Sequence, residues 1–119
     1  MKLRLIGVLL VAVACSDKTV TMPVIVTPGP NQVFMQGSAF VPATRTVTAG
    51  TTVQFVNMDG VTHTATSSSV PAGASAFSSG NLSTNGTFSV MLNTPGTYAY
   101  YCVFHGAPGT GMHATIVVN

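Results

Sequence analysis

Charged side chains are scarce in this 119-residue sequence, which contains four Lys or Arg and two Asp or Glu. Within residues 32–119 only Arg45 and Asp59 carry a formal charge, so that part of the chain is close to neutral. Nucleic-acid-binding domains carry a cluster of Lys and Arg, and no such cluster is present. Leu, Ile, Val and Phe occur in ordinary amounts, so the low charge does not predict disorder. We therefore exclude nucleic acid as a partner and expect a folded domain.

Long apolar runs are absent beyond the N-terminal segment, and none approaches the roughly 20 residues that span a bilayer. Residues 1–14 combine two basic residues with an apolar stretch, the pattern of an export signal peptide. Residues 12–15 resemble a bacterial lipobox, with Ala12 in place of the usual Leu, which predicts lipid on Cys15. The alternative is an ordinary signal peptide cleaved near Ala14. We favour lipidation because a free exported thiol would be reactive, and we expect a periplasmic or cell-surface protein attached to the membrane through Cys15.

The composition changes again between this segment and the main part of the chain. Residues 15–31 contain three Pro and one Gly, which is typical of a semi-extended tether. Residues 32–119 have the length of one small domain and are rich in Thr, Ser, Gly and Val, so many short strands and turns are expected. We therefore predict one domain over residues 32–119, and we expect a monomer.

Alternating apolar and polar residues predict the strands. Val53–Asn57 and Phe88–Leu92 alternate clearly; Asn85-Gly86 predicts a tight hairpin turn before the second strand, and Pro95-Gly96 predicts a type II turn after it. The other predicted strands are Val33–Phe40, Thr46–Val47, Thr62–Ser67, Thr97–Val103 and Ala114–Val118, with a surface loop over residues 67–76. Seven or eight such strands predict an all-β fold, a Greek-key β-sandwich.

The most informative segment carries a thiol, an imidazole and a thioether close together. Cys102 and His105 lie at the end of one predicted strand, and Met112 follows after a short loop with Pro and Gly. A second imidazole, His63, follows the alternating strand that ends near Asn57. One Cys and two His with a weak axial Met form the donor set of blue copper sites. In Thr97–Val103 the side chains of Tyr98, Tyr100 and Cys102 share one face, so both rings should pack inward beneath the sulfur.

Other interpretations of these residues are possible. Each one alone would more often be structural, because free Cys and Met commonly fill hydrophobic cores. Zinc also binds Cys and His, but a structural zinc site needs four strong ligands and Met is a weak one. The combination of His63, Cys102, His105 and Met112 therefore favours copper.

Several longer segments support the same conclusion by resemblance. They are Phe40–Pro42, Val47–Asp59, Thr62–Thr64, Phe77–Gly80, Gly86–Ser89, Pro95–Cys102 and Gly111–Val118. Together they resemble the cupredoxins, particularly the plastocyanin- and halocyanin-like branch, over nearly all of residues 32–119. The resemblance implies one type 1 copper, cycling between Cu(I) and Cu(II), with His63, Cys102 and His105 as equatorial ligands and Met112 as axial ligand.

Three positions differ from the usual pattern of those proteins. The loop from His105 to Met112 is longer than in plant plastocyanins. Thr64 stands where many relatives have an Asn that ties the ligand loops together, and His113 stands where a small residue is more usual. We expect His113 to point into solvent, and we expect Asn57, Thr64 and the backbone amides of residues 106–111 to orient ligands or bond the sulfur.

The resemblance implies a one-electron carrier. We expect redox partners to dock near His105, on an apolar rim formed by Val61, Phe104, Ala107 and Pro108. The alternative is an extracytoplasmic copper carrier or copper-resistance protein, although the remaining Met residues do not cluster in the sequence. No His-x-His pair and no Ser/His/Asp set is present, so we predict that the protein is not an enzyme.

Overall fold

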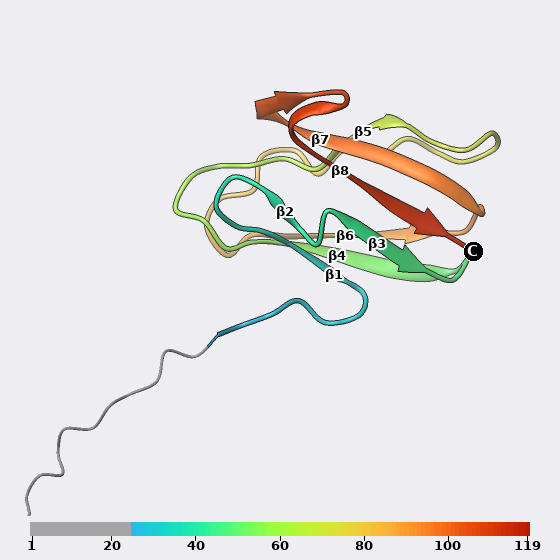
Figure 1. Cartoon of the computed structure of the whole chain (residues 1–119), viewed down its shortest axis with the longest axis horizontal. Helices are drawn as coiled ribbons and strands as arrows, with labels where there is room; N and C mark the ends of the chain where they lie inside the picture. The colour runs from blue at the N-terminus through green and yellow to red at the C-terminus, as the bar shows by residue number, and fades with distance from the viewer. Residues whose placement is uncertain (1–24) are drawn as a thin grey trace, which may run out of the picture.

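The computed structural model describes residues 25–119, which form an all-β fold with eight strands in two sheets. The strands are β1 (Gln32–Met35), β2 (Phe40–Val41), β3 (Thr44–Val47), β4 (Thr51–Asn57), β5 (Thr66–Ser69), β6 (Thr87–Leu92), β7 (Gly96–Ala107) and β8 (Thr110–Val118). The sheets form two layers, with β5, β7 and β8 in the upper layer and β1, β4 and β6 in the lower (Figure 1). The prediction of a β-sandwich with seven or eight strands is confirmed.

Each sheet mixes parallel and antiparallel pairs. The first has the order β2-β1-β4-β6, with β1 parallel to β4, and the second has the order β3-β8-β7-β5, with β3 parallel to β8. The turn at Pro95-Gly96 carries the chain from β6 in one sheet to β7 in the other. Figure 1 shows this crossing at the right-hand end of the sandwich.

The core follows from the alternation seen in the sequence. In β4 the side chains of Val53, Phe55 and Asn57 point inward, and in β7 those of Tyr98, Tyr100 and Cys102 do so. Phe55 and Tyr100 meet edge to face across the two sheets, with ring centroids 5.2 Å apart. This aromatic contact joins the layers one inward-facing position before Cys102, which the same alternation in β7 brings into the core.

Three local predictions are wrong. The predicted strand Val33–Phe40 is interrupted by a turn over residues 36–39, which lets β2 fold back antiparallel on β1. Thr62–Ser67 is not one strand, because His63 makes an isolated bridge with Leu82 before β5 begins at Thr66. β5 extends to Ser69, so the predicted loop over residues 67–76 begins later. In the second and third cases, pairing with a distant segment overrode the local pattern.

The Asn85-Gly86 pair also behaves differently from the prediction. Asn85 has the positive φ of 67° that such a turn requires, and the Gly86 amide donates to the Ser83 carbonyl. The turn does not form a hairpin, however, because β6 pairs with β4 instead of with the residues just before the turn. The turn therefore redirects the chain without setting strand register.

The predicted final strand, Ala114–Val118, is longer in the structure. β8 begins at Thr110, and β7 continues past His105 to Ala107, so the expected ligand loop is the tip of a β-hairpin. Register shifts between Tyr101↔His113 and Gly106↔Gly111, so residues 102–105 of β7 bulge opposite Met112 alone. The bulge explains why strand alternation could not predict this segment.

The predicted signal peptide and Cys15 lie outside the described residues, as does most of the tether. The last part of the tether is bonded to the domain, because the Arg45 guanidinium donates to the Gly29 and Gln32 carbonyls and the Gln54 amide donates to the Asn31 carbonyl. Within residues 25–119 the structure contains no helix long and apolar enough to cross a membrane.

Candidate metal centre

Three predicted ligand side chains converge at one end of the sandwich. His63 Nδ1 and His105 Nδ1 lie 3.1 Å apart, and Cys102 Sγ lies 3.6 Å from the first and 3.5 Å from the second. A point equidistant from the three atoms lies roughly 2 Å from each, close to the about 2.0–2.1 Å of a zinc–imidazole bond. Lone pairs this close repel one another unless a cation or a shared proton lies between them. The donor set therefore fits a metal ion of copper or zinc size.

His63 is held by backbone bonds in a loop between β4 and β5. Its amide donates to the Leu82 carbonyl and its carbonyl accepts from the Leu82 amide, at 3.1 and 2.8 Å. The side chain is fully buried. Both the main chain and the ring of His63 are therefore fixed by neighbours from other segments.

The β7 bulge brings the other residues together. Cys102 is fully buried and Met112, which lies opposite the bulge, is 3% exposed. The backbones of β7 and β8 lie very close together here, because a Cβ on Gly106 would lie 2.6 Å from the Met112 backbone. Gly111 has φ 65° and a Cβ there would lie 2.7 Å from the His105 carbonyl oxygen. Only glycine fits at these two positions without moving the backbone.

Thr64 connects the two ligand-bearing segments. Its amide donates to Cys102 Sγ at 3.4 Å, and its hydroxyl oxygen accepts from the Val103 amide at 3.1 Å. Thr64 thus orients the cysteine directly, as the sequence suggested. Asn57 acts on the His63 loop and not on the sulfur. Its side-chain amide donates to the Val61 and Leu82 carbonyls and so holds that loop in shape. The backbone amides of residues 106–111, which all lie in the described part of the chain, do not donate to the sulfur.

Asp59 contacts His63 directly, although the sequence indicated it only as one of the two formal charges within residues 32–119. Its Oδ2 lies 2.7 Å from His63 Nε2, and its carboxylate accepts the Gly37 and Ser38 amides at 2.8 and 2.9 Å. Burial acts to raise the pKa of Asp59, but the bonds from Ser38, His63 and Gly37 outweigh it and the net pKa is lowered. The only available signal was the four-residue spacing between the sole carboxylate of the domain and a candidate ligand.

The two imidazoles differ in exposure. His63 is fully buried, whereas His105 is exposed, and so are Val61 and Phe104, at 51% and 54%. Pro108 at the hairpin tip is also exposed and Ala107 is half-buried. His113 points outward as expected, donating from Nδ1 to the Gly111 carbonyl at 2.9 Å, and is not among the three converging side chains.

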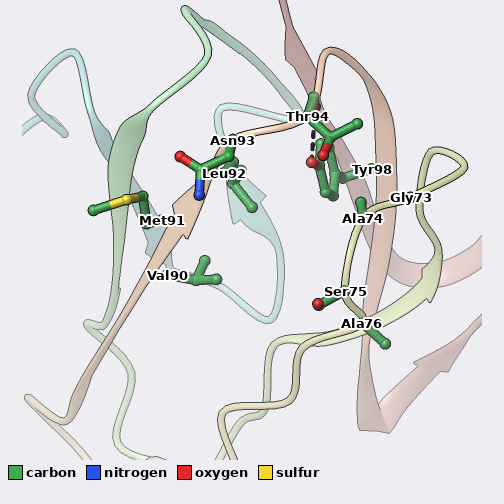
Figure 2. Close-up of a pocket in the computed structure, with 10 residues that line it drawn as sticks. All are labelled: Gly73, Ala74, Ser75, Ala76, Val90, Met91, Leu92, Asn93, Thr94 and Tyr98. Carbon is green, nitrogen blue, oxygen red and sulfur yellow. Dashed lines mark hydrogen bonds between the residues drawn. The ribbon is translucent and has the colours of Figure 1, made fainter.

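A separate pocket lies away from these residues, toward the opposite end of β6. It is lined by residues 73–76, residues 90–94 and Tyr98, and Figure 2 shows the Tyr98 hydroxyl bonded to the Thr94 carbonyl. Its lining contains no His, Cys, Asp or Glu. The pocket therefore offers no metal ligands, and the chemistry of the domain is concentrated at the end with His63.

The sandwich and this end of it define the class of protein. A β-sandwich that gathers one Cys and two His near a buried Met at one end is a cupredoxin. The sequence of residues 27–119 matches the family described as copper binding proteins, plastocyanin/azurin family. The chain belongs to this family, and its metal is copper.

Individual relatives agree with the family. The chain is 43% identical to plastocyanin from Ulva prolifera over 87 residues, which covers 68% of this chain and 87% of that protein. It is 39% identical to plastocyanin from Prochlorothrix hollandica over 82 residues, covering 66% of this chain and 61% of the relative. The chain thus spans less than two thirds of that second relative.

Solved structures show the same fold. A purple cupredoxin from Nitrosopumilus maritimus superposes with a TM-score of 0.60 at 25% identity, covering 74% of this chain and 98% of that one. A copper-containing nitrite reductase from Thermus scotoductus gives a TM-score of 0.67 at 27% identity, covering 85% of this chain but 25% of the enzyme. This chain therefore corresponds to one part of that larger protein.

Proposed function

We propose that the protein is a one-electron carrier in which His63 Nδ1, Cys102 Sγ and His105 Nδ1 hold copper and Met112 is the axial ligand. The observation that carries the proposal is the convergence of these two nitrogens and the sulfur at 3.1 to 3.6 Å. When bound, copper supplies a Cu(I)/Cu(II) couple. Backbone bonds to Leu82 hold His63, and the Thr64 amide holds the Cys102 sulfur, so these two side chains can move little when the charge of the site changes.

The visible spectrum of the purified, copper-loaded, oxidised protein tests the proposal. A thiolate ligand gives intense charge-transfer absorption, so we expect a strongly coloured protein. A colourless protein that binds copper would contradict electron transfer through a thiolate site and support the copper-carrier alternative. A colourless protein that prefers zinc would point to a structural site.

The role of Met112 requires its own test. Replacing Met112 with Leu keeps the apolar volume but removes a weak sulfur donor, which disfavours Cu(II) more than Cu(I). We expect the colour to remain and the reduction potential to rise. An unchanged potential would exclude Met112 as the axial ligand.

We propose a carrier and not an enzyme. General acid–base catalysis requires a group within reach of a substrate. Asp59 is the sole carboxylate among residues 25–119, and its oxygens already accept two amides and contact His63. Assay of the copper-loaded protein for nitrite reduction checks this directly, and turnover above that of free copper would contradict it.

We propose that redox partners dock on the apolar rim formed by Val61, Phe104, Ala107 and Pro108 around His105. The rim exposes apolar side chains and one imidazole edge, and weak redox encounters use small interfaces. Because Arg45 and Asp59 are the only formal charges within residues 32–119, bimolecular transfer should change less than roughly threefold with salt, against the about 10–1000-fold that steering supplies. Ala107→Asp should slow transfer at every salt concentration; a steep salt dependence in the parent protein would contradict apolar docking.

The location of the protein is a proposal that rests on the sequence. An export signal over residues 1–14 and lipid on Cys15 would make it a monomeric periplasmic or cell-surface protein anchored to the membrane. Cys15→Ser should then move the protein from the membrane fraction to the soluble exported fraction, because firm anchoring needs more than one acyl chain. Continued sedimentation of the variant with membranes would contradict a lipid anchor.

A further inference from the structure

Asp59 contacts His63 on the side of the ring opposite the converging ligand atoms. His63 Nδ1 faces Cys102 Sγ and His105 Nδ1, while Nε2 lies 2.7 Å from Asp59 Oδ2. An ionised carboxylate has lone pairs only, so it accepts a hydrogen bond from Nε2–H and repels a bare Nε2. The ring is therefore set with its proton on Nε2 and its lone pair on Nδ1, the form that binds metal through Nδ1.

The carboxylate is itself fixed by a second segment of the chain. Gly37 and Ser38 both have positive φ, 64° and 54°, and their successive amides donate to the two oxygens of Asp59. The Asp59 amide donates to Asn57 Oδ1, and Thr84 Oγ1 donates to the Asp59 carbonyl. Bonds from three separate parts of the chain thus hold Asp59 in place.

The charge of Asp59 is not cancelled by a nearby cationic side chain. Within residues 25–119 the only Lys or Arg is Arg45, and its guanidinium donates to the Gly29 and Gln32 carbonyls instead. The Asp59 side chain is 17% exposed, so water screens it only in part. A full negative charge therefore lies one imidazole ring away from the converging ligand atoms.

We propose that Asp59 is a positioning residue that holds His63 as an Nδ1 donor and makes the site favour Cu(II) over Cu(I). The inference rests on the proposed role of His63 as a ligand. A negative charge near a metal stabilises the more highly charged ion, so the carboxylate lowers the reduction potential. A purely structural Asp59 would hold the turn of residues 36–39 without affecting either property.

The first test uses the metal-free wild-type protein and needs no variant. Nitrogen-15 NMR at about pH 8, above the usual range for imidazole protonation, reports where His63 carries its proton. We expect the Nε2–H tautomer. A ring protonated on Nδ1, alone or together with Nε2, overturns the proposal. This result does not depend on copper, so it stays informative even if the electron-carrier proposal fails.

The second test compares Asp59→Asn with Arg45→Gln. Asn keeps the size of Asp and one acceptor oxygen but removes the charge, whereas Arg45→Gln removes a charge that is not bonded to the site. Affinities for Cu(I) and Cu(II) are measured separately by competition, together with the reduction potential. For Asp59→Asn we expect about a tenfold loss of Cu(II) affinity relative to Cu(I), equivalent to a potential raised by about 59 mV for one electron.

Two outcomes of the second test decide the proposal. A shift of threefold or more toward Cu(I) in Asp59→Asn, with less than half that shift in Arg45→Gln, supports it. A smaller shift, a shift in the opposite direction, or a shift in Arg45→Gln at least half as large as that in Asp59→Asn overturns it, even if Asp59→Asn melts at a lower temperature. A wild-type protein without thiolate–copper absorption would instead refute the proposed function.

Discussion

The middle of the sandwich differs from the end that carries His63, Cys102 and His105, which we call the metal end. Both regions have buried side chains, but different interactions hold them together. The middle consists of aromatic rings from both sheets, among them Phe40, Phe55 and Tyr100, with centroids 4.7 to 6.4 Å apart. The buried Asn, His and Thr side chains of the described residues, Asn57, His63 and Thr64, all lie at the metal end. The middle thus depends on shape and apolar area, and the metal end depends on directed hydrogen bonds.

This difference separates stability from function. Apolar contacts have no preferred partner, so the rings can stabilise the sandwich without determining what the end binds. At the metal end each polar group has a specific partner, such as Thr64 to Val103 or Asn57 to Leu82. Substitutions in the middle should therefore alter stability alone, whereas substitutions at the end should alter the metal centre and, where they break a hydrogen bond, stability as well.

The largest effect is expected from Cys102→Ser. Removing the thiolate should abolish the intense colour of the copper form, while the free energy of unfolding of the metal-free protein changes by less than about 3 kcal/mol. Absorption spectra and denaturant unfolding measure the two quantities. If the variant stays blue, Cys102 is not a ligand and the assignment of the metal end is wrong.

Phe55→Ala should show the opposite pattern. Phe55 is fully buried and contacts rings from both sheets, so its truncation should cost about 3–5 kcal/mol of unfolding free energy. Below its lowered melting temperature the variant should keep the colour of the parent. Loss of colour in a folded variant would mean that the two regions are not separable.

Thr64→Val should have an intermediate effect. It removes the acceptor of the Val103 amide and leaves that donor unpaired, which costs about 1–3 kcal/mol. Thr66→Val is the matched control, because it removes only the hydroxyl contact between the two threonines. Chemical denaturation of the metal-free proteins should show the larger loss in Thr64→Val; equal losses would mean that the tie to Val103 contributes nothing.

The smallest effect is expected from Tyr100→Phe. The Tyr100 hydroxyl is buried without a hydrogen-bond partner in the described part of the chain, and burial raises its pKa far above the usual value. Its removal should leave the free energy of unfolding within about 1 kcal/mol of the parent, or raise it. Tyr98→Phe, which loses the bond to Thr94, should instead destabilise by about 0.5–1.5 kcal/mol. The reverse order would show that Tyr100 has a partner.

The two regions were also unequally predictable from the sequence. The alternation in Thr97–Val103 placed Tyr98, Tyr100 and Cys102 on the inner face, because strand periodicity is a local property. The contact between Asp59 and His63 depends on amides from the turn between β1 and β2, about twenty residues earlier. The bulge opposite Met112 depends on how β7 pairs with β8. No local pattern encodes such contacts, so residue chemistry indicated the ligands but not their supports.

The register shift in the β7–β8 hairpin has a consequence for how the site can vary. Pairing resumes beyond the bulge at Gly106↔Gly111 and Ala107↔Thr110, so the tip is closed by its own ladder. Insertions at Pro108 and Gly109 would therefore lengthen the hairpin tip, and substitutions there would change its side chains. Neither change would displace the sheets or the buried His63. The hairpin behaves as an interchangeable module, and the surface next to His105 can diversify toward new partners while the donor set stays constant.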